Sequence, residues 1–176
     1  MAMTTEQQSP PVADTRVASL LMTATYVVGG VGFFLGFQQA TSSDAASAIE
    51  PVAVLSVGVV GIVSMVRHSI FNRSDAVRMG WDLGRRNNFQ IEVGFANLAI
   101  GVPALLSVAL DWGTTAQAAL VLAYALYFAQ VAVLSALAIR DEGRAALVRM
   151  AIMVIMAGFL AWFSLAALAE VDARPF

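Results

Sequence analysis

The sequence predicts an all-α polytopic membrane protein, a bundle of five transmembrane helices in one domain. The 176 residues are 59% hydrophobic and only 12% charged, whereas soluble domains carry about 25% charged residues. The mean hydropathy is +0.76. The chain also contains five apolar runs, each close to the roughly 20 residues that a spanning helix needs. A transmembrane β-barrel would instead show segments of about ten residues with alternating polarity.

The composition also narrows the possible functions. The formal net charge is −2, so no strongly basic character points to a nucleic acid. The chain has no cysteine, which excludes disulfides, thiolate metal sites and thiol catalysis. Its single histidine, His68, has no nucleophile motif beside it. The chain also has no lysine, which a phosphate-binding loop would need. We therefore expect no cofactor, no bound metal and no enzymatic activity.

The first two spans follow from charge-free runs. Residues 1–16 are polar and predict a mobile tail, followed by an apolar run at residues 17–37. A cleaved signal peptide has a shorter apolar region, of about 7 to 15 residues, after positive charge, so this run predicts a retained first span. The second span is predicted over residues 51–68, because Pro51 suits the first turn of a helix.

Three further spans complete the predicted domain, which covers residues 17–170. They are expected at residues 89–110, 115–139 and 149–169, with a short external tail at residues 171–176. Nine of the ten arginines lie before the first span, between spans two and three, and around the connection between spans four and five. Because alternating spans return these regions to one side, the positive-inside rule predicts a cytoplasmic N-terminus and an external C-terminus. We expect the membrane to be a bacterial inner membrane.

The connector between spans two and three is the longest. Ile70, Val77 and Trp81 recur in it at helical spacing. This pattern is consistent with ordinary positive-inside charge, and also with a short helix in the headgroup layer that contacts anionic lipid. The arginines expected to make that contact are Arg73, Arg78, Arg85 and Arg86.

Glu92 is the only acidic residue within a predicted span. A carboxylate near the membrane boundary is tolerable when a basic group pairs with it. Candidate partners at the same level are Arg67, His68, Arg140 and Arg149. A pair with an arginine would be structural, whereas a contact with His68 could relay protons or bind a ligand.

Two amides lie deeper in the membrane. Asn97 and Gln130 are predicted at comparable depths on spans three and four, and Tyr127 lies one turn from Gln130. Their structural interpretation is hydrogen bonding between helices. The functional interpretation is a polar cavity for a small ligand or a quinone head group, lined by these residues and Tyr124.

Small residues mark the predicted helix contacts. Span one contains Gly32 and Gly36 four residues apart, and span three contains Gly94 and Gly101 on one face. Such pairs allow helices to approach closely, either within the bundle or between protomers.

The segment Phe89–Gly101 reads F-x-x-E-x-G-x-A-N-L-x-x-G, and it follows a basic loop that contains Gly80–Trp81. It resembles a family of small bacterial integral membrane proteins of unknown function. It is also distantly similar to DoxX-like membrane proteins, which are usually four-helix bundles. The resemblance implies no activity, but it directs attention to Glu92, Gly94, Asn97 and Gly101.

These observations predict a non-enzymatic membrane protein that binds a small ligand or lipid, or an accessory subunit of a membrane complex. One alternative is a small transporter or proton-coupled channel that uses Glu92, and another is a quinone-interacting redox component. The expected partners are membrane lipids and further copies of the chain or a larger membrane complex, but no nucleic acid.

Overall fold

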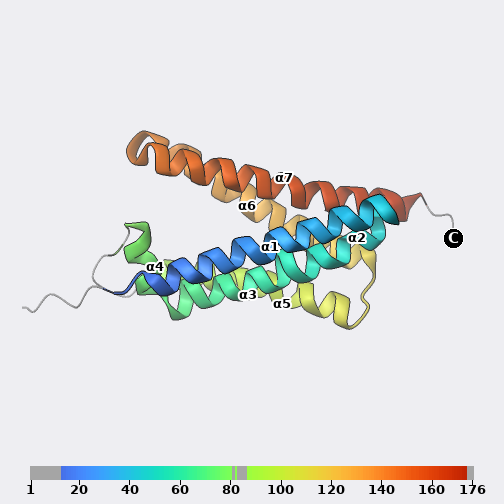
Figure 1. Ribbon diagram of the computed structural model, residues 1–176, viewed down its shortest axis with the longest axis horizontal. Coiled ribbons are helices and arrows are strands. Elements are labelled where there is room, and N and C mark those ends of the chain that lie inside the picture. The colour runs from blue at the N-terminus through green and yellow to red at the C-terminus, as the bar shows by residue number, and fades with distance from the viewer. Residues whose placement is uncertain (1–12, 81, 83–86, 174–176) are drawn as a thin grey trace, which may run out of the picture.

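The computed structural model describes residues 13–80, 82 and 87–173, and within these residues helix is the only regular secondary structure (Figure 1). Five helical segments are long and apolar enough to cross a membrane. The predicted all-α fold with five membrane-spanning helices is therefore confirmed. Residues 1–12 of the predicted mobile tail and residues 174–176 of the predicted external tail lie outside the described residues.

Four of the five spans are single helices, and the second consists of four consecutive shorter helical segments. The single helices are α1 (Arg16–Ser42), α5 (Asn88–Ala109), α6 (Thr114–Glu142) and α7 (Arg144–Asp172). The second span runs from Ala45 to Ile70 through α2 (Ala45–Pro51), η1 (Val52–Val59), α3 (Val60–Met65) and η2 (Val66–Ile70).

The second span begins six residues earlier than predicted. Asp44 caps α2, because its side chain accepts a hydrogen bond of 2.6 Å from the backbone N–H of Ser47. Pro51 therefore lies inside the span, where its ring conflicts with the carbonyl four residues before it. The helix continues as the π-helical segment η1, whose wider turn accommodates a residue that cannot donate a backbone hydrogen bond.

The connector after the second span contains the short helix α4 (Asn72–Met79). Gly80 ends it with a φ of +75°, a left-handed conformation that glycine adopts without steric cost. Arg78 in α4 forms an ion pair with Asp75 instead of extending freely toward lipid. Trp81, Arg85 and Arg86 lie outside the described residues.

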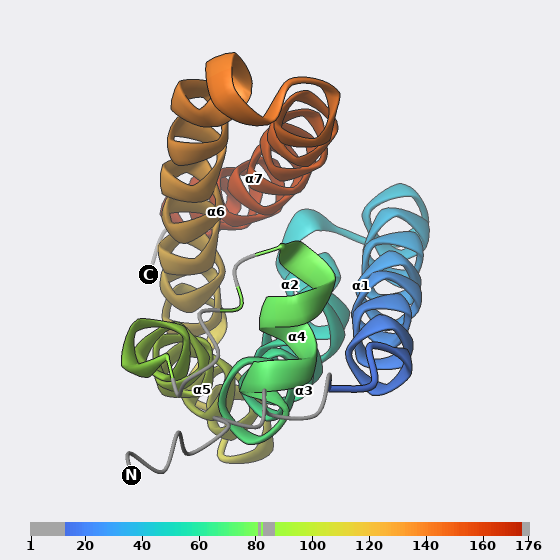
Figure 2. The same cartoon turned by 90° about the vertical axis from the view of Figure 1, so that its left-hand side faces the viewer.

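The spans form two unequal groups. Figures 1 and 2 show α1, the second span and α5 side by side, with α6 and α7 forming a separate antiparallel hairpin. This hairpin converges with α1 and α2 toward the C-terminal end of the molecule and diverges from α1 toward the end that carries α4 (Figure 1). The buried core runs where the two groups meet. Its largest fully buried side chains include Ile49, Val57, Tyr124, Leu160 and Phe163.

Glycines set the spacing within the first group. Gly32 and Gly36 of α1 face η1, and a Cβ at Gly36 would lie 2.7 Å from Val52 Cγ2. Gly94 and Gly101 of α5 face the second span, and a Cβ at Gly101 would lie 2.9 Å from a backbone oxygen. The sequence left open whether these glycines pack within the bundle or between protomers. The structure places all four against neighbouring helices of the same chain.

Candidate functional site

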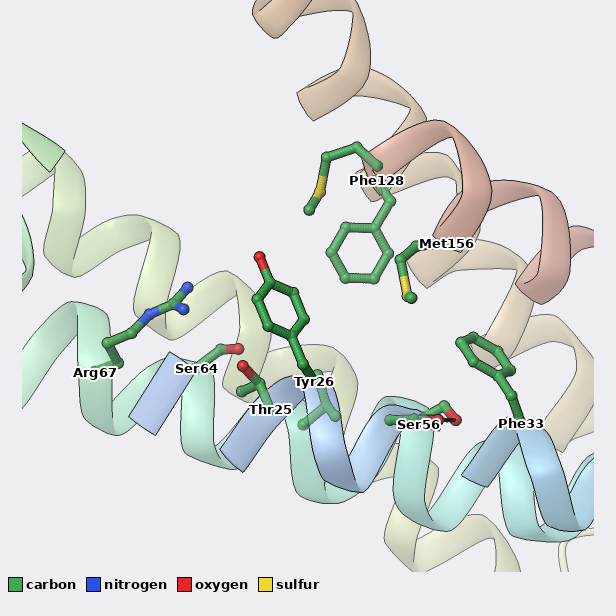
Figure 3. A pocket seen from close by; sticks show the side chains of 11 residues that line it. Thr25, Tyr26, Phe33, Ser56, Ser64, Arg67, Phe128 and Met156 are labelled. Atoms are coloured by element: carbon green, nitrogen blue, oxygen red, sulfur yellow. Dashed lines mark hydrogen bonds between the residues drawn. The ribbon is translucent and has the colours of Figure 1, made fainter. Parts of the chain in front are cut away.

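A cavity of about 80 Å³ lies where α1, the second span, α6 and α7 diverge. Figure 3 shows Arg67, Ser64 and Thr25 at one end of it and Phe33 at the other, with Tyr26 and Phe128 between them. The residues that line it are Thr25, Tyr26, Gly29, Phe33, Ser56, Val60, Ser64, Arg67, Phe128, Met153 and Met156. The cavity is therefore amphipathic, with a cation near one end and aromatic and methionine side chains at the other.

Large side chains hold this cavity open. Phe33 of α1 packs edge-on against Phe159 of α7, with ring centroids 5.5 Å apart, and lies parallel to Phe163 at 6.1 Å. Phe37 and Phe163 lie at 4.8 Å one turn further along α1. Because these rings fix the distance between α1 and α7, the space beyond them, toward α4, remains open and is lined by Met153 and Met156.

Two hydroxyl groups of the cavity have already donated their hydrogens to backbone carbonyls. Thr25 donates its hydroxyl hydrogen to the carbonyl oxygen of Met22 at 2.6 Å. Ser56, on the π-helical segment η1, donates to the carbonyl oxygen of Gly29 at 2.8 Å. A hydroxyl group has a single hydrogen, so these two oxygens can only accept further hydrogen bonds.

Arg67 brings a positive charge to the lining. It lies in η2, three residues before the end of the second span, and only 13% of its side chain is exposed. Its Nε lies 3.7 Å from Asp75 Oδ1, too far for a hydrogen bond, and is buried without a hydrogen-bond partner among the described residues. Guanidinium groups remain protonated in proteins, so this charge is permanent.

Asp75 is the centre of a buried charge cluster behind Arg67. Its side chain is fully buried, and Arg78 donates to its Oδ1 at 2.9 Å. Gln90 at the start of α5 donates to its Oδ2, also at 2.9 Å. The cluster therefore ties α4 to both the second span and α5.

The ionisation of Asp75 follows from these contacts. Burial by itself disfavours the carboxylate and raises its pKa. The contact with His68 and the positive charges of Arg67 and Arg78 outweigh burial, and together they lower the pKa of Asp75 from 3.8 to about 2. Asp75 is therefore ionised at neutral pH.

His68 connects Arg67 to Asp75. Its Nε2 lies 2.7 Å from Arg67 Nη2, and its Nδ1 lies 2.8 Å from Asp75 Oδ2. Arginine has no acceptor atom, so Nε2 must accept from Arg67 and the ring hydrogen must be on Nδ1. His68 is neutral in this arrangement. The cluster of Arg67, Arg78 and Asp75 therefore holds two positive charges and one negative charge.

Asn97 lies in a separate polar contact between α5 and α6. Its Oδ1 accepts a hydrogen bond of 2.7 Å from the hydroxyl group of Tyr124. Its Nδ2 donates to the carbonyl oxygen of Val93 at 2.7 Å and to the hydroxyl oxygen of Tyr127 at 3.2 Å. Nδ2 thus makes one hydrogen bond within α5 and one to α6, and the bond that Oδ1 accepts from Tyr124 is a second link between the two helices. This arrangement matches the structural interpretation of Asn97 as an interhelical hydrogen-bonding group.

Two of the candidate residues lie away from both sites. Glu92 is exposed on α5, and the structure does not bring it to His68, which contacts Asp75 instead. Gln130 is exposed on α6 and does not reach Asn97, which bonds to the two tyrosines. Within the described residues, no group of three or more His, Cys, Asp or Glu side chains is arranged to hold a metal ion.

Asp75 and Gln90 were not predicted as site residues from the sequence, and Arg67 was expected there only as a possible partner of Glu92. A signal for Asp75 was present, because Asp75 and Arg78 are three residues apart in a segment with helical spacing. The cavity itself has no sequence motif, since its lining comes from four separate spans.

The family comparison concerns nearly the whole chain. Residues 15–174 match the model of a family of unknown function, DUF6790. The chain belongs to this family, as the resemblance to small membrane proteins of unknown function predicted. The distant similarity to DoxX-like proteins stays a prediction. Comparisons with curated proteins and with solved structures gave no match.

Proposed function

We propose that this member of DUF6790 is a non-enzymatic membrane protein that takes an amphipathic small molecule from the bilayer into the cavity between α1, α3, α6 and α7. The observation that carries the proposal is the lining of that cavity. Binding sites for small molecules are mostly apolar, with a few polar groups that orient the ligand. Here Phe33, Phe128 and Met156 provide the apolar surface, and Arg67 provides the orienting group.

Mass spectrometry of the intact protein tests this proposal, with the protein extracted into polymer-bounded lipid discs. The wild-type chain is expected to retain a small molecule after the surrounding lipids are removed. Met156→Trp fills the cavity and is expected to release it. Ile155→Trp, on an exposed position of the same helix, is the matched control and should retain it. Retention that is equal in both variants, or absent from the wild type, would contradict the proposal.

The same spectrum reports how many chains associate, and whether a different chain accompanies them. We expect either several copies of this chain or a larger membrane complex. A quinone would be recognised by its mass and its ultraviolet absorption. Detection of a bound quinone would favour the redox alternative over lipid binding.

We further propose that the end carrying α4 faces the cytoplasm of a bacterial cell. The arginines of α4 and of the α6–α7 turn lie at this end, opposite the C-terminus (Figure 1), as the positive-inside rule requires. Because the chain has no cysteine, single cysteines can report the orientation. Ser43→Cys is expected to react with an impermeant maleimide in intact cells, and Asp141→Cys only after lysis. The reverse pattern would overturn this topology.

A further inference from the structure

The polar and apolar ends of the cavity lie in the same order as the head group and the chain of a lipid in one membrane leaflet. Arg67 lies near the end of the second span, whereas Ser56 lies eleven residues earlier, near the middle of the same span. Phe33 lines the cavity near this deeper end (Figure 3). The cation is therefore at the level of the membrane surface and the apolar lining extends toward the membrane centre. A lipid of that leaflet has its head group and its chain in the same order.

The hydrogen-bonding capacity of the lining favours an acceptor as the head group. Arg67 still has donors for a ligand, because a guanidinium group carries five N–H hydrogens and its hydrogen bond to the described residues is the one from Nη2 to His68 Nε2. A guanidinium group is suited to carboxylate and phosphate oxygens, which it can bind through two parallel hydrogen bonds.

The charge balance favours an anion over a neutral acceptor. His68 is neutral, so Asp75 must compensate both Arg67 and Arg78. Asp75 accepts a hydrogen bond of 2.9 Å from Arg78, whereas Arg67 Nε lies 3.7 Å away. Among the described residues, one positive charge of this cluster is left without a counter-charge. A buried charge is costly near a membrane unless it is paired, and an anionic head group would supply the missing charge.

We infer that the cavity binds a single-chain amphiphile with an anionic head group, a carboxylate or a phosphate, which pairs with Arg67 while its chain extends along Tyr26, Phe128 and Met156. A cavity of about 80 Å³ encloses the head group and only the first part of one chain, so the rest of the chain must extend beyond it. Tyr26 is 43% exposed, so the chain can leave the cavity on the side of Tyr26. This inference rests on the proposed function, because it names the chemical class of the ligand.

Photocrosslinking tests the inference with three probes that carry the same diazirine-bearing C18 chain: a fatty acid, a lysophosphatidic acid and the fatty alcohol. Each probe is added to the purified wild-type protein in lipid discs, and the modified residues are mapped by mass spectrometry. At least one anionic probe is expected to label Phe128, Met153 or Met156. It should label them about tenfold more strongly than the alcohol, which is the discrimination expected of one charge-assisted interaction.

Variants then assign the discrimination to Arg67. Arg67→Gln should remove the preference for the anionic probe, and Arg67→Lys should keep part of it. Arg140→Gln, at an exposed arginine of the α6–α7 hairpin, should leave it unchanged. If Arg67→Gln does not fold, the comparison of probes on the wild type still decides the inference.

Each outcome has a defined meaning. Labelling by the fatty acid alone identifies a carboxylate ligand, and labelling by the lysophosphatidic acid alone identifies a phosphate ligand. Equal labelling by the alcohol at the cavity overturns the anionic head group and leaves the proposed function standing. Failure of all three probes to label the cavity counts against both.

Discussion

Between the second span and α5 the two backbones are in contact, whereas between α1 and α7 aromatic rings separate the helices. A Cβ at Gly61 would lie 2.7 Å from the carbonyl oxygen of Asn97. The rings of Phe33 and Phe159, by contrast, keep their centroids 5.5 Å apart. In lipid no hydrophobic effect drives helices together, so their spacing depends on the side chains at the contact. The comparison shows how one bundle contains both a close-packed half and an open cavity.

The ion pairs of Asp75 also stabilise the close-packed half, at the end that carries α4. Replacing Asp75 with asparagine is expected to have the largest effect on stability. Asp75→Asn leaves Arg67 and Arg78 buried without their counter-charge, so we expect the free energy of unfolding to fall by about 3 to 5 kcal/mol. Titration with SDS in mixed micelles, followed by tryptophan fluorescence, measures the change. Asp141→Asn, at an exposed position, is the control and should cost less than about 0.5 kcal/mol.

The second test fills the backbone contact itself. Gly61→Ala places a methyl group against the backbone of α5, which cannot yield like a flexible side chain. We expect a loss of about 3 kcal/mol, the upper part of the usual range for overpacking. Gly158→Ala in α7, where a Cβ would meet nothing within 4 Å, is the matched control. An equal effect of both substitutions in the same SDS titration would show that close packing does not stabilise this half.

Lowering the pH protonates Asp75 and so tests the contribution of the charge cluster to stability without a mutation. The pKa of Asp75 is lowered from 3.8 to about 2 in the folded protein, so the unfolded chain binds a proton more readily. The resulting stabilisation, about 2 kcal/mol, is complete above pH 3.8 and is lost as the pH falls toward 2. Thermal unfolding in detergent between pH 5 and pH 2 measures it. The Asp75→Asn variant should lack this component, and an identical acid response in the variant would exclude Asp75 as its source.

The smallest effect is expected at the contact between the two halves. Tyr127→Phe removes the hydrogen bond of 3.2 Å from Asn97 Nδ2 and leaves the shorter bond from Tyr124 in place. Hydrogen bonds between helices in membranes contribute about 0.6 kcal/mol on average, so we expect a loss of that size in SDS titration. A loss of more than about 2 kcal/mol would show that Tyr127 has a role beyond this single bond.

The spans and the cluster differ in how far the sequence could predict them. Five apolar runs predict five helices, because burying an unpaired backbone group in lipid is costly and helices satisfy these groups internally. The partner of His68 was not predictable in this way. Glu92 was the expected acid because it lies within a span, but Asp75 reaches His68 because α4 folds back against the end of the second span.

The π-helical segments explain why the sequence did not predict which residues of the second span share a face. η1 and η2 together span 13 residues of the second span, and their hydrogen bonds close a wider turn than those of an α-helix. A pattern read at 3.6 residues per turn therefore assigns faces incorrectly beyond Pro51. Ser56 and Arg67, which line the cavity, both lie in these segments, so no regular spacing predicted that they share a face.

The sequence alone determined that this chain forms five helices long and apolar enough to cross a membrane, and which glycines could bring these helices together. These properties depend on local hydropathy and on side-chain size, which each segment carries by itself. Only the tertiary structure decided that Asp75 gathers the charges at one end and that Arg67 lines a cavity. The first depends on α4 folding back against the end of the second span. The second depends on how far α6 and α7 diverge from α1, a distance set by aromatic side chains from separate helices.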